Sequence, residues 1–254
     1  MNTSNILCIA LIFMSCSFFT QNESIESKYD RAILKFQEEK YSKSRDILQL
    51  VLDEDRYNNE ARFYYAESLY KLKNYSQAMS EYNQYILNSI TDSDRVEYSR
   101  YMLCLSQYYS ISDYNKDSKD IFNTIDQIQF FIESYNKSNY NSELEDLLVN
   151  LRSMLARKEF ESARLYLKLE QYDASRLYME NIINNYYDTE YVDDAILGMI
   201  ISFCLQNDYA KAQTVYNNNL EKLNNEFSAS FAKDLLDSSK VGLSTLYKIY
   251  IKWN

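Results

Sequence analysis

Apolar and small residues recur at fixed intervals along this chain, in two stretches that closely resemble each other. The segment YSKSRDILQLV, at 41–51, is matched by YSQAMSEYNQY, at 75–85, so that Tyr41 corresponds to Tyr75 after 34 residues. Within each stretch the apolar and small residues lie three or four positions apart, which is the spacing of one face of an α-helix. The pattern therefore predicts helices that repeat with a 34-residue period.

A 34-residue period is typical of the tetratricopeptide repeat, a pair of antiparallel helices that stacks on its neighbours. Small residues where the two helices approach are Ala32 and Ser44 in the repeat 25–58, Ala66 and Ala78 in 59–92, and Ala163 and Ser175 in 156–189. A stretched third repeat carries a polar insert at 110–118, and a weaker fifth repeat runs from Ile200 to Tyr216. We predict an all-α tetratricopeptide solenoid of about five helix pairs over 25–220. The apolar residues of 221–254 predict a helical cap, with a partner-docking surface as the alternative.

The first residues have the features of an export signal. The apolar run from Ile6 to Met14 is shorter than the roughly 20 residues that a membrane-spanning helix needs. It is followed by Ser15 and Cys16, a small residue and a cysteine as in a bacterial lipobox. We expect a signal peptide at 1–15, a lipid attached to Cys16 and a tether over 16–24. An ordinary secretory signal and a buried N-terminal helix are the alternatives.

The amino-acid composition limits the kinds of partner and of catalytic or metal site that we expect. The formal net charge of −10 argues against a nucleic-acid partner, because phosphate binding needs a basic surface. The chain has no histidine, no phosphate-binding glycine loop and no metal-ligand spacing, so we expect no catalytic residues, no metal and no cofactor. Cys104 and Cys204 lie in apolar helical runs, where free thiols behave as small hydrophobic side chains.

The first helix of each repeat in such a solenoid faces a concave surface. In the first two repeats the positions expected there are mainly aromatic and apolar, with some acidic residues, which suits an extended or helical peptide with aromatic side chains. The alternative is that these side chains pack against neighbouring helices. The expected groove residues are Tyr29, Ile33, Phe36, Phe63, Glu67 and Tyr70.

The fourth repeat, LARKEFESARLYLKLEQYDASRLYMENIINNYYDT, resembles the BamD family of outer-membrane lipoproteins of the β-barrel assembly (Bam) machinery. SYNKSNY, at 134–140, resembles the family's YPNSxY segment, and the insert at 114–117 is similar to that of Bacteroidetes members. The likeness extends over about 24–220. Residues that match the fourth-repeat pattern are Leu155, Ala156, Glu159, Ala163, Tyr166, Tyr172, Ala174, Asp188 and Thr189.

This resemblance implies a non-enzymatic scaffold, lipid-anchored at the periplasmic face of the outer membrane. Its C-terminal repeats would hold the periplasmic domains of BamA, with other Bam subunits as further partners. Its N-terminal repeats would receive unfolded outer-membrane proteins through their aromatic-ending signal. The chain departs from the family where Asn136 and Tyr187 replace helix-ending prolines, and where Tyr178 replaces a partner-binding arginine, with Arg176 two residues earlier. Another periplasmic tetratricopeptide lipoprotein, a pilotin or a Tol–Pal-associated adaptor, is the alternative.

Overall fold

The computed structural model describes residues 23–56, 58–91, 93–111, 118–223, 225–237 and 245. Every regular element in these ranges is helical, which confirms the all-α prediction. The chain divides into two compact units, 1–106 and 107–254, with the boundary inside helix α6. Cys16 and the rest of 1–22 lie outside the described residues, so the predicted signal peptide and anchor stay predictions.

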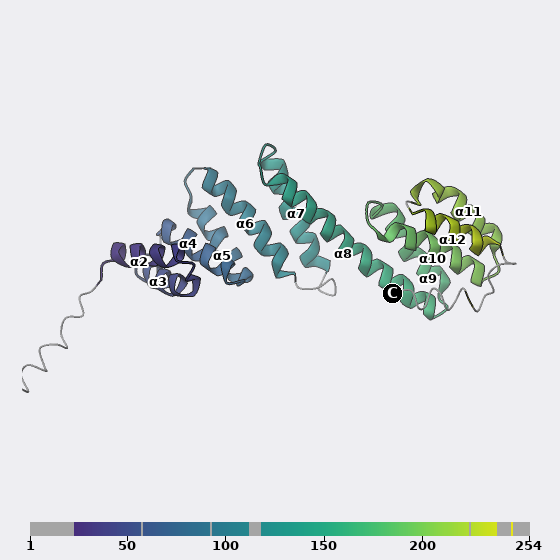
Figure 1. The fold of residues 1–254 in the computed structure, drawn as a ribbon, viewed down its shortest axis with the longest axis horizontal. Helices are drawn as coiled ribbons and strands as arrows, with labels where there is room; N and C mark the ends of the chain where they lie inside the picture. The colour runs from purple at the N-terminus through teal and green to yellow at the C-terminus, as the bar shows by residue number, and fades with distance from the viewer. Residues whose placement is uncertain are drawn as a thin grey trace, which may run out of the picture. The chain divides into compact units, whose positions relative to one another are not determined.

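The first unit contains two helix pairs, which can be followed in Figure 1. Helix α2 (Ile25–Gln37) packs on α3 (Tyr41–Glu54), and α4 (Asn59–Lys71) packs on both α3 and α5 (Tyr75–Asn88). Helix α6 (Asp94–Ser110) follows, and the unit ends at its residue Ser106. Neighbours in sequence are thus neighbours in space, as the repeat period predicts.

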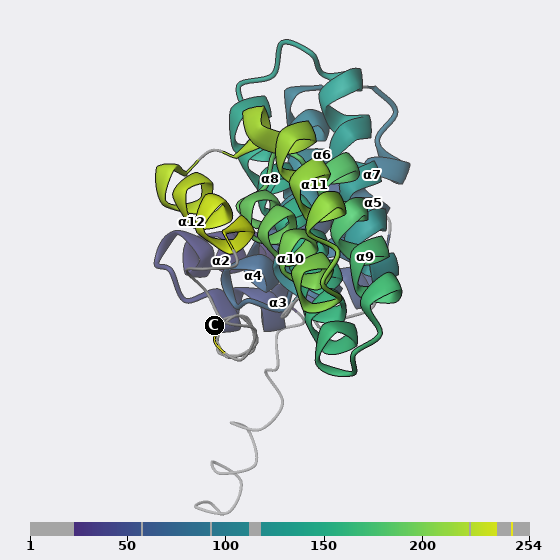
Figure 2. The ribbon, with the colours of Figure 1, turned by 90° about the vertical axis from the view of Figure 1, so that its right-hand side faces the viewer.

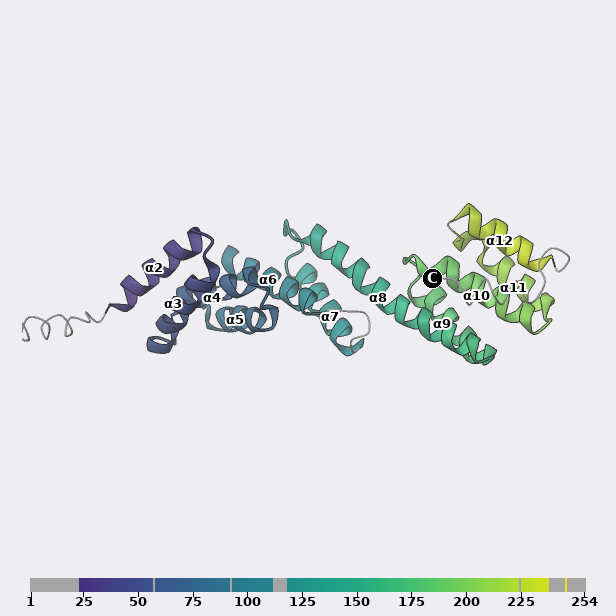
Figure 3. The same ribbon diagram turned by 60° about the horizontal axis from the view of Figure 1, so that its bottom comes forward.

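The second unit begins with the end of α6 and continues with α7 (Ser118–Ser134) and α8 (Asn141–Lys168). Helix α9 (Tyr172–Asn185) packs between α8 and α10 (Tyr191–Leu205), and α11 (Tyr209–Asn219) packs on α10. A short 3-10 turn, η1 (Leu220–Lys222), leads to α12 (Glu226–Leu236), which lies beside α10 and α11 (Figures 2 and 3). The remainder of the predicted cap, 238–244 and 246–254, lies outside the described residues.

The small residues of the repeats lie where the paired helices touch. Ala32, Ser44, Ala163 and Ser175 have no exposed surface. The Ser44 hydroxyl donates to the carbonyl of Ala32 at 2.9 Å, and the Ser175 hydroxyl donates to that of Ala163 at 2.8 Å. The same hydrogen bond in two repeats confirms that they share one packing geometry, and it satisfies a polar group that would otherwise be costly to bury.

Each of four tight turns between paired helices contains a residue with positive φ: Glu39, Lys73, Glu170 and Asn207, with φ between 57° and 60°. In the first of these turns, the amide of Lys40 donates to the carbonyl of Lys35 and that of Glu39 donates to Phe36, both at 2.9 Å. This is the Schellman motif, which closes a helix by hydrogen bonds and usually has glycine at the left-handed position. The repeat therefore stops its helices without glycine or proline.

Helix α8 is longer than the repeat pattern predicts. It starts at Asn141 and runs without a break for 28 residues, whereas the fourth repeat is expected to begin at 156. Neither glycine nor proline interrupts this stretch, and the buried residues Leu144, Leu147, Leu151 and Leu155 extend its apolar face. Figure 3 shows one continuous helix, with α7 along its first part and α9 along its last part.

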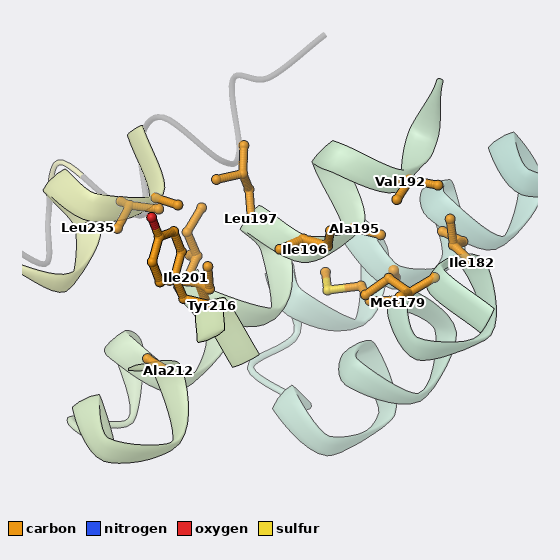
Figure 4. Close-up of a cluster of buried hydrophobic side chains, with 14 of the residues drawn as sticks. Met179, Ile182, Val192, Ala195, Ile196, Leu197, Ile201, Ala212, Tyr216 and Leu235 are labelled. Carbon is orange, nitrogen blue, oxygen red and sulfur yellow. The ribbon is translucent and has the colours of Figure 1, made fainter. Parts of the chain in front are cut away.

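The core of the second unit is formed mainly by α9 to α12. Ile201 of α10, Tyr216 of α11 and Leu235 of α12 lie together in Figure 4, and Met179 and Ile182 of α9 pack on the opposite side of α10. Because α10 is covered on several faces, nine of its 15 residues are buried, which makes it the central helix of this unit. None of the described helices is long and apolar enough to cross a membrane.

Candidate functional site

The first two repeats bring three aromatic rings of the expected groove region together. Tyr64, on α4, has its ring centroid 6.4 Å from that of Tyr29 and 5.4 Å from that of Phe36, both on α2 and both in edge-to-face geometry. All three side chains are half-buried, so part of each ring can still be covered by a ligand. Tyr64 is not among the residues that the repeat pattern placed in the groove. Its position beside Phe63 in the same aromatic run was the signal available.

Phe63 and Glu67, which were expected to line the groove, are buried. Phe63 is 9% exposed and Glu67 is 6% exposed, so neither offers appreciable surface to a ligand. The Phe63 ring packs on Tyr64, Tyr85 and Tyr98, and the Arg95 guanidinium carbon lies 5.0 Å from its centroid. These two side chains therefore pack between helices and do not face a groove. Packing between helices was the alternative that the sequence left open.

Glu67 is held by tyrosine hydroxyls. The hydroxyl of Tyr82 donates to one carboxylate oxygen, and that of Tyr98 donates to the other at 3.3 Å. Burial raises the pKa of Glu67 above its ordinary value, while the two hydrogen bonds and the charge of Lys71 act in the opposite direction. Hydrogen bonds therefore offset part of the cost of placing this carboxylate among aromatic rings.

A pocket of about 460 Å³ lies beside the aromatic cluster. Tyr29 and Ile25 supply apolar walls, and Glu26, Asp30 and Glu60 supply carboxylates. The Arg95 guanidinium holds both carboxylate oxygens of Glu60 at 2.6 Å. Burial, and then the charge of Glu60, raise the pKa of Tyr29 to about 12, so its hydroxyl is a neutral donor at physiological pH.

Ile33 and Tyr70, the other two expected groove residues, are half-buried. The Tyr70 ring contacts that of Tyr75 across the α4–α5 turn, with centroids 5.5 Å apart. The aromatic cluster of Tyr29, Phe36 and Tyr64 thus forms around α2 and the middle of α4, while Tyr70 lies near the C-terminal end of α4.

The second unit has a pocket of its own, of about 470 Å³. Tyr108 from the end of α6, Met154 and Arg157 from α8, and Glu190 and Tyr191 at the start of α10 line it. The Ser153 hydroxyl donates to the carboxylate of Glu190. This pocket combines aromatic walls with one positive and one negative side chain, a combination that suits a peptide better than an apolar small molecule.

Residues of the fourth-repeat motif have structural roles in this unit. Arg152 of α8 donates to the two carboxylate oxygens of Asp188, from Nε at 2.8 Å and from Nη2 at 2.7 Å, and also donates to the carbonyl of Asn185. These hydrogen bonds lower the pKa of Asp188. Thr189 donates to the carbonyl of Tyr186 at 2.8 Å. The Arg152–Asp188 pair therefore ties the α9–α10 connection to α8. It lies next to Tyr187, which stands where the family has a helix-ending proline.

Arg176 and Tyr178 are committed to contacts inside the unit. The Arg176 guanidinium lies 4.1 Å from the Phe203 ring centroid and donates to Asp173, Ser202 and Gln206. The Tyr178 ring stacks on Tyr166, with centroids 5.4 Å apart. Arg176 thus has its charge satisfied on α9 and α10, which makes it a poor substitute for an arginine that reaches a partner.

The thiols of Cys104 and Cys204 are buried in the way that small apolar side chains are. Cys104 and Cys204 are both buried, and neither forms a disulfide. Burial raises the pKa of Cys104 to about 12 and that of Cys204 to about 11, so both are protonated at physiological pH and poorly nucleophilic. Among the described residues, no group of histidine, cysteine or carboxylate side chains is arranged to hold a metal ion.

Comparison with known proteins matches residues 21–228 to the family YfiO, described as outer membrane lipoprotein. The chain is 27% identical over 222 residues to the outer membrane protein assembly factor BamD of Rickettsia prowazekii, a match that covers 83% of this chain and 87% of that protein. It is 28% identical over 125 residues to BamD of Helicobacter pylori, covering 48% and 56% respectively. These relatives give no support to the expected likeness to Bacteroidetes members, and 112–117 of the insert lie outside the described residues.

Two solved tetratricopeptide proteins also resemble the chain. YrrB, reported with an unusual peptide-binding site, is 10% identical with a TM-score of 0.35, covering 86% of this chain and 96% of that one. A thermophilic tetratricopeptide protein of Thermus thermophilus, TTC0263, is 11% identical with a TM-score of 0.36, covering 84% and 99%. TM-scores this low do not support the transfer of a binding site.

Proposed function

Because this chain belongs to the YfiO family of outer membrane lipoproteins, we propose that it is a scaffold of the Bam machinery that binds both BamA and incoming barrel precursors. Two curated relatives are outer membrane protein assembly factors named BamD. The chain is an assembly factor and not an enzyme. Family membership also replaces the alternative of a pilotin or a Tol–Pal-associated adaptor.

The proposed anchor is a lipid on Cys16. Membership of a lipoprotein family supports it, as does the sequence that precedes the cysteine. With 16–24 as a tether, the helical units would lie at the periplasmic face of the outer membrane, attached to its inner leaflet. A single acyl chain gives only marginal membrane binding, whereas the several chains of a lipidated N-terminal cysteine give stable anchoring.

We assign precursor binding to the first unit. The half-buried rings of Tyr29, Phe36 and Tyr64, beside a pocket of about 460 Å³, can receive an aromatic side chain. Aromatic anchors in partly enclosed pockets dominate the binding energy of many peptide complexes. Ile33 and Tyr70 would contribute flanking contacts, and Phe63 and Glu67 would support the cluster from behind. The periplasmic domains of BamA and the other Bam subunits are then assigned to the second unit.

Family membership carries this proposal, and co-purification tests it. The full chain, extracted from membranes in mild detergent, should bring a large β-barrel protein with it. A Cys16→Ala variant should be released when membranes are washed with alkaline carbonate, which strips proteins held only by protein contacts, because it has no lipid. It should still capture that barrel protein from a detergent extract.

Membrane fractionation and co-purification test separate parts of the proposal. Retention of Cys16→Ala on the carbonate-washed membranes, as complete as that of wild type, would end the lipid-anchor assignment alone. The absence of any barrel protein from the wild-type sample, with the helical content intact by circular dichroism, would end the assignment to the Bam machinery.

A further inference from the structure

The pocket of the first unit carries more negative charge than the helices around it neutralise. Of its three carboxylates, that of Glu60 is held by Arg95, whereas Glu26 and Asp30 form no ion pair with any described residue. Burial, then the charge of Glu60 and, more weakly, that of Asp30 raise the pKa of Tyr29, so this ring lies in a negative potential. The basic residues of α2 form their ion pairs elsewhere: Lys28 with Glu54, Arg31 with Glu23 and Lys35 with Glu38.

Asp30 is the pocket carboxylate that helix formation does not favour. Glu26 and Glu60 lie in the first turns of α2 and α4, where the partial positive charge at the start of a helix stabilises an acid. Asp30 lies four residues after Glu26 on α2, so it gains little from the helix start and repels Glu26. Both side chains are exposed and accessible to a ligand. A cationic group between them would replace one repulsion by two attractions.

Tyr29 belongs both to this pocket and to the aromatic cluster. Its ring centroid lies 6.4 Å from that of Tyr64. Side chains two residues apart on an extended strand point to the same face and lie about 6.5–7 Å apart. An extended peptide with an aromatic ring on Tyr64 can therefore place the side chain two residues away beside Tyr29. A lysine or arginine there gains a cation–π contact with that ring as well as the nearby carboxylates.

We propose that the first unit prefers precursor strands with a lysine or arginine two residues from the aromatic anchor, and that Glu26 and Asp30 bind this basic side chain. The inference rests on the proposed function, because it specifies which strands that same site selects. Glu60 stays paired with Arg95 and forms the wall of the pocket on α4. An acidic residue at the same place in the strand would be repelled.

Three peptides of one extended sequence, acetylated and amidated and with one central phenylalanine, test the preference. The first has lysine two residues to either side of the phenylalanine, the second has lysine one residue to either side, and the third has glutamine in place of lysine in the first. The first two have the same composition and charge, but the lysines of the second point to the opposite face of the strand. We expect the full chain in mild detergent to bind the first peptide about threefold to fivefold more tightly than the second, the upper range for exposed ion pairs.

Variants of the protein locate the source of this preference. Asp30→Asn should reduce the ratio of the two affinities toward one. Asp46→Asn, at an exposed position on α3 of the same unit, removes the same charge and should keep the ratio. Raising the salt concentration should also reduce the ratio in wild type, because salt screens exposed charges.

The possible failures separate this inference from the proposed function. Equal binding of the first and second peptides to wild type would overturn the inference alone, because an aromatic anchor without charge selection still satisfies the proposed function. An equal change of the ratio in Asp30→Asn and Asp46→Asn would overturn it too, since net charge would then explain the preference. If none of the three peptides binds while circular dichroism shows intact helices, precursor binding by the first unit fails, and this inference fails with it.

Discussion

Glu67 is an acidic side chain buried among packed aromatic rings, a place where acidic residues are rare. It is 6% exposed, with the hydroxyls of Tyr82 and Tyr98 as its hydrogen-bond donors. Since the pKa of the folded state lies above the ordinary 4.5, the folded protein retains this proton where the unfolded chain has lost it. The stability contributed by Glu67 is therefore complete below about pH 4.5 and declines as pH rises through its folded-state pKa.

We predict that Glu67→Gln raises the free energy of unfolding at neutral pH and removes this residue's contribution to the pH dependence. The amide oxygen of glutamine can still accept from Tyr82, and no charge is buried. Glu67→Ala is the paired variant, and it should lower the free energy of unfolding by about 1–3 kcal/mol because it leaves the buried Tyr82 hydroxyl without an acceptor. Urea melts at a series of pH values measure both effects. A Gln variant less stable than wild type at neutral pH would show that the charged form is preferred.

The turns between paired helices are the elements that were hardest to predict from the sequence. Helix positions could be predicted because Ala32, Ala66 and Ala163 leave room for the opposing helix, and all three are fully buried. The left-handed residues carry no such signature, because Glu, Lys and Asn stand where glycine is usual. For a similar reason the start of α8 was missed: a helix extends wherever nothing stops it, and the period alone does not locate that point.

The exposed groove was predicted only in part. Tyr29 lines the pocket and Phe36 is half-buried beside Tyr64, so their groove role stays a prediction. A repeat position fixes the direction of a side chain and not what covers it. Phe63 is buried because Tyr64, Tyr85 and Tyr98 converge on it from three helices. Such convergence depends on tertiary contacts that local spacing does not encode.

Glu170→Gly tests the turn geometry. A non-glycine residue in the left-handed region is strained by roughly 1–2 kcal/mol, and glycine removes that strain but costs more entropy on folding. We expect a net gain of about 0.5–1 kcal/mol in the free energy of unfolding. Asn207→Gly should gain less, because asparagine tolerates this conformation.

The control for this turn is Glu161→Gly, at an exposed position inside α8, which should lose about 1 kcal/mol. Denaturant melts of the three variants at one pH give the comparison. A loss at Glu170 similar to that at Glu161 would mean that the turn is not left-handed in solution.

On the scale of the whole molecule, two compact units allow two binding activities to be separated by mutation. We predict that Tyr29→Ala weakens binding of a peptide from the last strand of a barrel protein by about 2 kcal/mol, the usual scale of an aromatic anchor. Capture of BamA, assigned to the second unit, should not change. Peptide titration and co-purification on the same variant measure the two activities.

Phe122→Ala is the matched control for Tyr29→Ala, because it removes an exposed aromatic side chain from α7, in the other unit. Equal peptide affinity for wild type and Tyr29→Ala would remove Tyr29 from the binding surface. Loss of both activities in Tyr29→Ala would indicate unfolding, which circular dichroism would reveal.

Helix α8 has a consequence for the order in which the chain matures. During synthesis the polypeptide emerges from its N-terminus, and α2 can pack on α3 once the three residues between them and α3 itself have emerged. Helix α7 must wait for the first part of α8, which then stays in place as the template for α9. Six residues separate α7 from α8, against three between α2 and α3, so the buried face of α7, with Ile121, Ile128 and Phe131, waits longer for its covering helix. This interval is when a holding chaperone would bind the nascent protein most effectively.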